Sequence, residues 1–324
     1  MGIGKSITNK INQTLKRSRN SSRSSVIIVA VVLVVLMFYL ALSSEVFLSY
    51  GNLFNLFRST SIYGVIAIGM TFVILTGGID LSVGSVVGLT SILTTMMIKN
   101  GMPLFLSIVI AMAAAVTVGI LNGIIIHFGK VPPFIATLGS MTVVRGMIKL
   151  ISDAKMITGL PKEFSDFALK ASLGLPNLFW IWLLVILVSW FILTRTIYGR
   201  NVYAIGSNEE SARLSGISIS RNIVYVYATS AFLSGLAGIM LASRLASGIP
   251  TAGSGYELDA IAATVVGGTA LTGAKGGVLG TFLGSILLAT IRNGGVLLGI
   301  NPFILEVIIG LLIVVAVIAQ RGSK

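Results

Sequence analysis

Cysteine is absent from this sequence of 324 residues, and histidine occurs only once, as His127. These absences exclude a disulfide framework, a thiolate nucleophile and a metal site built from several histidines. Charge is also scarce, because Asp, Glu, Lys and Arg make up only 10% of the chain, whereas an average soluble domain has about 25%. With 55% hydrophobic residues and a mean hydropathy of +0.98, the composition excludes a water-soluble enzyme and indicates a protein surrounded by lipid.

Acidic residues are the rarer charged group, with 10 Asp and Glu against 23 Lys and Arg, which gives a net charge of +13. Such a balance is typical of nucleic-acid binding, but membrane proteins also concentrate Lys and Arg in cytoplasmic loops. Residues 1–25 contain six basic residues and no acid, and residues 26–44 contain no charge. This apolar run is longer than the roughly 7–15 residues of a secretory signal. It therefore predicts an uncleaved first membrane helix with a cytoplasmic N-terminus.

Apolar runs of about 20 residues predict an all-α, polytopic helical membrane protein with about ten transmembrane helices, roughly eight to eleven. With the N-terminus inside, 14 basic residues fall in cytoplasmic segments and 8 in outer segments, and Arg145 lies within a span. This bias agrees with the positive-inside rule, places both termini in the cytoplasm and removes the reason to expect nucleic acid as a partner. The predicted spans are residues 26–44, 59–76, 82–98, 104–127, 132–151, 177–195, 222–246, 258–272, 277–292 and 302–320.

No change of composition marks a separate soluble domain. We expect a basic cytoplasmic tail over residues 1–25, one transmembrane domain over 26–320 and a short cytoplasmic tail over 321–324. Two long polar loops interrupt the apolar pattern, an outer one near 152–176 and a cytoplasmic one near 195–221.

The cytoplasmic loop carries the clearest local signal. Ser207 and Glu210 have the spacing of a capping box, in which two side chains satisfy amides at the start of a helix. Glu209 lies at the positive end of the helix dipole and Arg213 toward its negative end, and Gly216 provides a C-terminal stop. The pattern predicts a helix of about two turns, which is marginal alone. It either docks in the groove of a partner or remains a solvated loop helix.

Glycine recurs at a spacing of four in residues 84–88 and 280–284, and the stretch 235–238 contains the small residues Gly235, Ala237 and Gly238. Small residues allow helices in lipid to approach closely, or to slide past each other. Leu-Thr-Gly occurs at 75–77 and again at 271–273, and both copies have the same orientation in the predicted topology. Because 37 residues are glycine, we interpret this recurrence as helix packing and not as an inverted repeat.

Ionisable residues within the apolar region are few. Gly77, Gly78 and Asp80 predict a sharp structural turn, with Asp80 capping the helix that follows. Glu306 lies near the start of the last helix, where Arg292 is expected to pair with it. No chain of buried carboxylates crosses the bilayer, which argues against a carrier coupled to protons or sodium.

The tripeptide Gly4-Lys5-Ser6 matches the last three residues of the phosphate-binding motif Gly-x-x-x-x-Gly-Lys-Ser/Thr. The motif needs another glycine five positions before Gly4, and no glycine stands there. We therefore expect no nucleotide hydrolysis by this route, and an energy source outside the chain.

Four stretches, GMTFVILTGGIDLSVGS (69–85), PFIATLGSMTVVRG (133–146), YAIGSNEESARLSGI (203–217) and PTAGSGYELDAIAATVVGGTALTGAKGGVLGT (250–281), match a known family. By these motifs the sequence resembles the membrane-spanning permease of bacterial ATP-binding cassette sugar importers, in their ribose-type branch. With the layout of spans, the resemblance covers nearly the whole chain.

The resemblance implies a permease in the bacterial cytoplasmic (inner) membrane that pairs with a second permease copy, as a homodimer. It also implies a cytoplasmic ATPase that binds ATP and Mg²⁺, an extracytoplasmic sugar-binding protein, and no cofactor, metal or catalytic residue on this chain. The positions carried over to ATPase coupling are Ser207, Asn208, Glu209, Glu210, Ala212, Arg213, Leu214 and Gly216. Those placed near the outer face, as a gate or a contact with the binding protein, are Tyr256, Glu257 and Asp259.

Three alternatives stay open at this point. The first is a self-sufficient secondary carrier, which the scarcity of buried acids disfavours. The second is a related permease for branched-chain amino acids, which would carry a zwitterion. The third is an intramembrane enzyme using Asp80, His127 or Arg145, although no two of these are near in sequence. The sequence does not identify the sugar.

Overall fold

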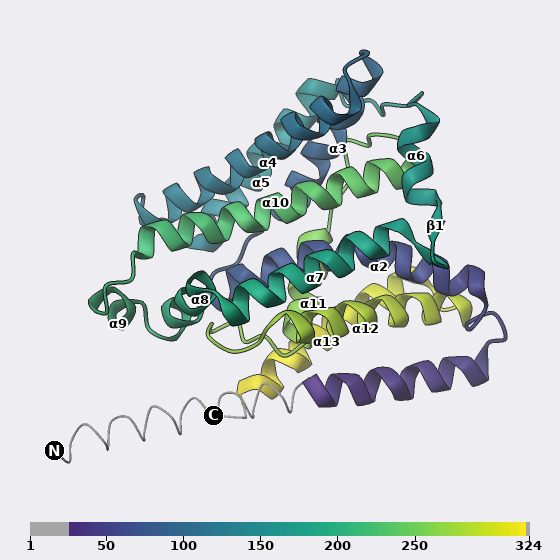
Figure 1. The fold of residues 1–324 in the computed structure, drawn as a ribbon. Coiled ribbons are helices and arrows are strands. Elements are labelled where there is room, and N and C mark those ends of the chain that lie inside the picture. The colour runs from purple at the N-terminus through teal and green to yellow at the C-terminus, as the bar shows by residue number, and fades with distance from the viewer. Residues whose placement is uncertain (1–25, 322–324) are drawn as a thin grey trace.

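The computed structural model describes residues 26–321, and within this range the chain is mostly helical (Figure 1). The predicted tail over residues 1–25, and residues 322–324, lie outside the described part. One small hairpin pairs β1 (Ala171–Ser172) with β2 (Leu175–Pro176). The helices are α1 (Val26–Ser43), α2 (Tyr50–Leu75), α3 (Val83–Lys99), α4 (Leu104–His127), α5 (Pro133–Ser152), α6 (Lys162–Leu169), α7 (Asn177–Arg195), α8 (Ile197–Ser207), α9 (Glu209–Leu214), α10 (Ile219–Leu245), α11 (Tyr256–Val266), α12 (Val278–Leu297) and α13 (Pro302–Arg321).

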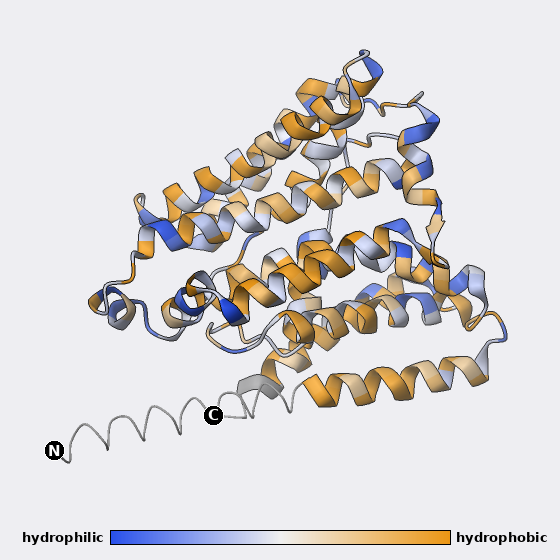
Figure 2. Ribbon diagram, in the orientation of Figure 1, coloured by the Kyte–Doolittle hydropathy of each residue, from blue (hydrophilic) through white to orange (hydrophobic). Residues whose placement is uncertain are grey.

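The all-α prediction is confirmed, and each of the ten predicted spans contains a helix. Among the described residues, six helices are long and apolar enough to cross a membrane: α1, α2, α4, α5, α7 and α10. Two further apolar helices, α3 and the 302–318 part of α13, are shorter. Hydrophobic residues line the long helices, whereas hydrophilic residues gather near helix ends and in loops (Figure 2).

The helices form one bundle around α2 and α10. Helix α10 packs against α4, α3 and α2, while α2 also contacts α7, α11 and α12. Gly119 of α4 permits a close approach to α10, because a Cβ atom there would meet the Tyr227 carbonyl oxygen. Most of α1, α4 and α5 faces outward, as expected of surfaces that contact lipid or another chain.

The bundle has two distinct ends, which we call the α9 end and the α6 end. Helices α8 and α9 lie at the first, and α6 with the β1–β2 hairpin lies at the second (Figure 1). Helix α1 begins, and α13 finishes, toward the α9 end. The depth of a residue in the bundle is its position between these two ends.

Candidate functional site

Helix α9 is fixed by a cap at each end. Asn208 precedes it, and its side-chain oxygen accepts a hydrogen bond from the Ser211 amide at 2.7 Å. After the helix, Gly216 adopts φ +83° and its amide donates to the Arg213 carbonyl, while the Ile217 amide reaches the Ala212 carbonyl. These two bonds form a Schellman motif. The chain therefore specifies α9 locally at both ends.

The predicted capping box is wrong by one residue. Ser207 is the last residue of α8, so it cannot begin the next helix, and Asn208 takes the capping position instead. Glu209 and Glu210 still occupy the first turn and Arg213 the last, as the dipole argument requires.

The outward surface of α9 combines an apolar side chain with an ion pair. Leu214 is 77% exposed, whereas Ala212 is buried against the protein. Arg213 donates from Nε to Glu210 Oε2 at 2.9 Å and from Nη2 to Oε1 at 2.5 Å. These hydrogen bonds lower the pKa of Glu210, so the pair is present at neutral pH and is lost as the pH falls. The remaining predicted coupling residues, Ser207, Asn208, Glu209 and Gly216, are exposed as well.

Behind α9, three glycines from distant segments meet backbone to backbone. A Cβ atom on Gly206 of α8 would collide with the Leu75 carbonyl oxygen and lie 2.8 Å from the Ala274 nitrogen. A Cβ atom on Gly273 would lie 3.1 Å from the Gly77 nitrogen and from the Gly206 Cα. We call Gly77, Gly206 and Gly273 the glycine junction.

Hydrogen bonds close the glycine junction. The Ala274 amide donates to the Leu75 carbonyl at 2.9 Å, and the Tyr203 hydroxyl donates to the Gly276 carbonyl at 2.9 Å. The two Leu-Thr-Gly segments found in the sequence are thus brought together in space, where Gly77 and Gly273 both adopt positive φ. The α8–α9 segment is therefore in direct contact with the turns that precede α3 and α12.

Asp80 lies in the α2–α3 turn and is fully buried. It does not cap α3, because Ser82 stands at the N-cap. Its carboxylate instead accepts hydrogen bonds from the Ser82 amide at 2.9 Å, the Ser82 hydroxyl at 2.6 Å and the Ser230 hydroxyl at 2.9 Å. Asn122 of α4 donates to the Ser82 hydroxyl at 2.9 Å, and Gly78 leaves room for the hydroxyl of Tyr227. The carboxylate thus ties the turn to α10 directly and to α4 through Ser82.

Asp80→Ala is expected to lower the free energy of unfolding by about 3 kcal/mol, because it leaves the buried Ser82 amide without an acceptor. The melting temperature in detergent checks this. As the control, Asp166→Ala removes a carboxylate whose ion pair with Lys170 is exposed, and should change stability by less than about 1 kcal/mol. Equal losses in the two variants would contradict the role given to Asp80.

The residues suggested for an intramembrane enzyme do not converge. Arg145 of α5 donates to the Ala252 carbonyl at 2.6 Å, the His127 ring packs on Phe128, and Asp80 is engaged by serines. Across residues 26–321, no group of three or more His, Asp or Glu side chains could hold a metal ion.

The start of α11 packs against α2 and α3. Tyr256 packs on Tyr63, halfway along α2, with ring centroids 4.5 Å apart. Glu257 lies against Gly84 in the first turn of α3, and its Oε1 accepts the Gly255 amide at 3.2 Å. The 246–255 segment thus brings the start of α11 against α2 and α3, and the placement of these residues near the outer face stays a prediction.

Asp259, one turn further, pairs with Arg292 of α12 at 2.5 Å. The expected pairing of Arg292 with Glu306 is wrong, because the guanidinium of Arg292 forms its ion pair with the Asp259 carboxylate on α11.

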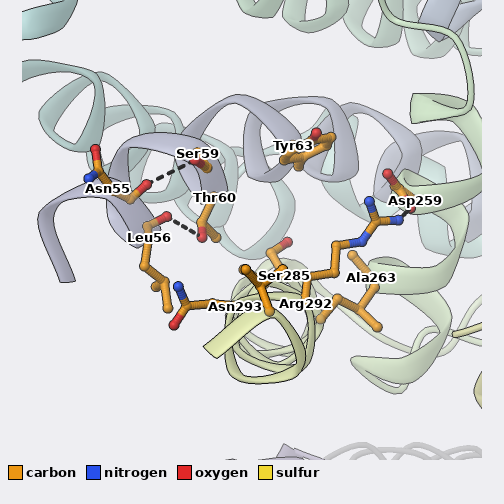
Figure 3. Close-up of a pocket in the computed structure, with 13 residues that line it drawn as sticks. Asn55, Leu56, Ser59, Thr60, Tyr63, Asp259, Ala263, Ser285, Arg292 and Asn293 are labelled. Carbon is orange, nitrogen blue, oxygen red and sulfur yellow. Dashed lines mark hydrogen bonds and ion pairs between the residues drawn. The ribbon is translucent and has the colours of Figure 1, made fainter. Parts of the chain in front are cut away.

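A cavity of about 290 Å³ opens beside this ion pair, between α2, α11 and α12 (Figure 3). It lies in the part of the bundle toward the α6 end, where α2 begins and α12 finishes. Hydroxyl and amide groups project from α2, and apolar side chains fill the spaces between them. The lining residues are Asn55, Leu56, Ser59, Thr60, Tyr63, Asp259, Ala263, Ser285, Leu288, Ala289, Arg292, Asn293 and Val296.

Comparison with known proteins identifies the family. A model described as "Branched-chain amino acid transport system / permease component" matches residues 52–317. The chain belongs to this permease family. The permease is 45% identical over 287 residues to the ribose import permease protein RbsC of Haemophilus influenzae. The aligned region covers 86% of this chain and 88% of that protein.

Two further relatives extend the comparison. The RbsC protein of Bacillus subtilis is 44% identical over 291 residues, 89% of this chain and 90% of its own length. The D-allose transport system permease protein AlsC of Escherichia coli is 36% identical over 282 residues, 87% of this chain and 86% of its own. No solved structure matches the permease. The family match contains α9, the glycine junction and the cavity, and it leaves α1 outside.

Proposed function

We propose that this permease is the membrane-spanning, non-catalytic subunit of an ATP-driven sugar importer, and that α9 docks on a separate cytoplasmic ATPase. The construction of α9 carries this proposal, because two caps fix a six-residue helix that exposes Leu214 and an ion pair. A helix so short is marginal alone, so its fixation at a surface favours docking to a partner. The glycine junction behind it offers a stiff route by which motion of the ATPase reaches the interior.

The proposed substrate is a neutral monosaccharide, ribose or a similar sugar. The ribose import permeases of Haemophilus influenzae and Bacillus subtilis are 45% and 44% identical to this chain, and the permease named for D-allose is 36% identical. The family description mentions branched-chain amino acids, but these full-length relatives favour a sugar.

The proposed topology has ten crossings, by α1, α2, α3, α4, α5, α7, α10, α11, α12 and α13, with both termini in the bacterial cytoplasm. Two observations support it, the excess of basic residues in the predicted cytoplasmic segments and the position of α9 at the end where α1 begins. The proposed partners are a second permease copy, the ATPase with its ATP and Mg²⁺, and an extracytoplasmic sugar-binding protein. Tyr256, Glu257 and Asp259 are proposed to form a gate at the outer side of the pathway or to contact the binding protein.

Reconstitution in proteoliposomes tests the function. The permease with its ATPase and binding protein should accumulate D-ribose only when ATP is supplied, and the permease alone should not accumulate it. Uptake by the permease alone, driven by a proton or sodium gradient, would establish a secondary carrier instead. ATP-driven uptake of L-leucine without D-ribose would establish the amino-acid alternative.

Replacing both Glu210 and Arg213 by alanine is expected to reduce sugar-stimulated ATP hydrolysis about tenfold, because the charged pair on the docking surface is lost. The pair is exposed, so insertion and melting temperature should stay unchanged. ATPase assays of the reconstituted importer check this. The matched control, Asp166→Ala with Lys170→Ala, removes an exposed ion pair between α6 and its C-terminal cap at the opposite end. Full transport by the α9 double variant would overturn the docking assignment of this pair.

A further inference from the structure

We propose that the cavity between α2, α11 and α12 is a binding site for a neutral polyhydroxylated molecule, a single pentose or hexose, held in the half of the permease nearer the α6 end. Neither the family match nor the names of the relatives assigns a ligand to this cavity. The choice of sugar as ligand rests on the proposed function.

The first argument is size and shape. The cavity measures about 290 Å³, just below the roughly 300–1,000 Å³ of sites that hold drug-sized ligands. A monosaccharide is smaller than such a ligand and fits. Three helices wall the space, and Asn293 of α12 exchanges amide hydrogen bonds with Asn52 of α2 at 2.7 and 3.0 Å. This pair of amides joins two of the walls.

The second argument is the hydrogen-bonding capacity of the walls. The hydroxyls of Ser59, Thr60 and Ser285 donate to carbonyls four residues earlier in their own helices, at 2.9, 2.7 and 2.8 Å. Figure 3 shows the first two of these bonds. Because each hydroxyl proton is used in this way, the oxygen lone pairs remain as acceptors. An array of acceptors suits a ligand whose own hydroxyls can donate.

The third argument is the ion pair in the wall. Arg292 and Asp259 cancel each other's charge. Among the lining residues, Asp259 is the carboxylate and Arg292 the cation, and the remaining ionisable group is the Tyr63 phenol. Their contact uses one guanidinium N–H and one carboxylate oxygen, so the pair still has donors and an acceptor for neighbouring sugar hydroxyls. A net-neutral wall gives no advantage to a charged ligand.

The pair also discriminates against an amino acid. The carboxylate and ammonium of a zwitterion would have to compete with the existing Asp259–Arg292 contact, so each charge gains less than it would from an unpaired partner. The apolar side chain of leucine would leave the hydroxyl acceptors of α2 and α12 unmatched. Leu56 and Leu288 provide enough apolar surface for the C–H groups of a sugar ring.

A single thiol in the cavity tests the proposal. The chain has no cysteine, so Ala289→Cys introduces one thiol at the cavity wall. A small, membrane-impermeant methanethiosulfonate added outside proteoliposomes should modify it. D-ribose at ten times its dissociation constant should slow modification about tenfold, and L-leucine at the same concentration should not. A matched variant, Ser165→Cys on α6, should react at a rate that neither ligand changes.

A second variant tests the hydroxyl acceptors themselves. Adding Ser59→Ala and Ser285→Ala to Ala289→Cys should raise the half-protecting concentration of D-ribose roughly 10- to 100-fold, from two lost hydrogen bonds. Thr117→Val, which removes a hydroxyl bonded in the same way on α4, should leave it unchanged. Three results would overturn the site: no modification from outside, no protection by D-ribose, or protection by L-leucine alone.

The thiol experiment uses the permease alone and needs no ATP. If the cavity does not bind D-ribose, the thiol is not protected but ATP-driven D-ribose uptake is still observed. If the proposed function is wrong, ATP-driven D-ribose uptake is absent, whether or not the thiol is protected.

Discussion

Gly206→Ala is expected to reduce ATP-driven sugar uptake about 5- to 150-fold, which corresponds to a loss of about 1–3 kcal/mol in coupling between two sites. The added Cβ atom would collide with the Leu75 carbonyl oxygen, which already accepts the Ala274 amide. Overpacking of this kind forces backbone to move. Here α8 must shift away from both Leu-Thr-Gly turns. Motion of α9 is then no longer transmitted through α8 to these turns.

The measurement is the number of sugar molecules imported per ATP hydrolysed by the reconstituted importer. This ratio should fall, while ATPase binding stays close to normal because the α9 surface is unchanged. Gly51→Ala is the matched control, since Gly51 lies in α2 and its Cβ atom would meet nothing within 4 Å. An unchanged ratio in Gly206→Ala would show that the glycine junction only packs helices and does not transmit motion.

The helices were predictable wherever hydropathy alone determines them. The predicted spans 104–127 and 177–195 coincide with α4 and α7, because each is an apolar run bounded by polar or proline-containing loops. By contrast, α2 begins at Tyr50, nine residues before its predicted start. Asn52, Asn55 and Arg58 interrupt the apolar run there, and their side chains form hydrogen bonds that a hydropathy scale does not contain.

The site was predictable only where its determinants are local. Gly216 ends α9 as expected, because a left-handed residue after a helix is a local requirement. The N-terminal cap was displaced by one residue, since Ser207 and Asn208 both suit that position and the extent of α8 decides between them. The glycine junction and the Arg292–Asp259 pair join residues far apart along the chain. No local spacing encodes such contacts, so they required the fold.

Leu214→Asp is expected to weaken association of the permease with its ATPase about 30-fold or more. Leu214 is 77% exposed on a helix fixed by its caps, so its apolar area is available to a partner. A leucine that is both exposed and rigidly positioned indicates that a groove on a partner buries it. Truncating or charging a central interface residue commonly costs about 2 kcal/mol or more of binding free energy. Co-purification of the ATPase with the permease in detergent measures the effect.

The matched control is Leu173→Asp, which charges a leucine that is 90% exposed in the hairpin at the α6 end. It should leave ATPase association unchanged, because an aspartate at either position meets water in the isolated permease and only the α9 position meets the ATPase. If Leu214→Asp also leaves association unchanged, the partner docks elsewhere on the cytoplasmic surface. Equal losses in both variants would instead indicate general misfolding. A loss confined to Leu214→Asp separates a docking role for α9 from that of a solvated loop helix.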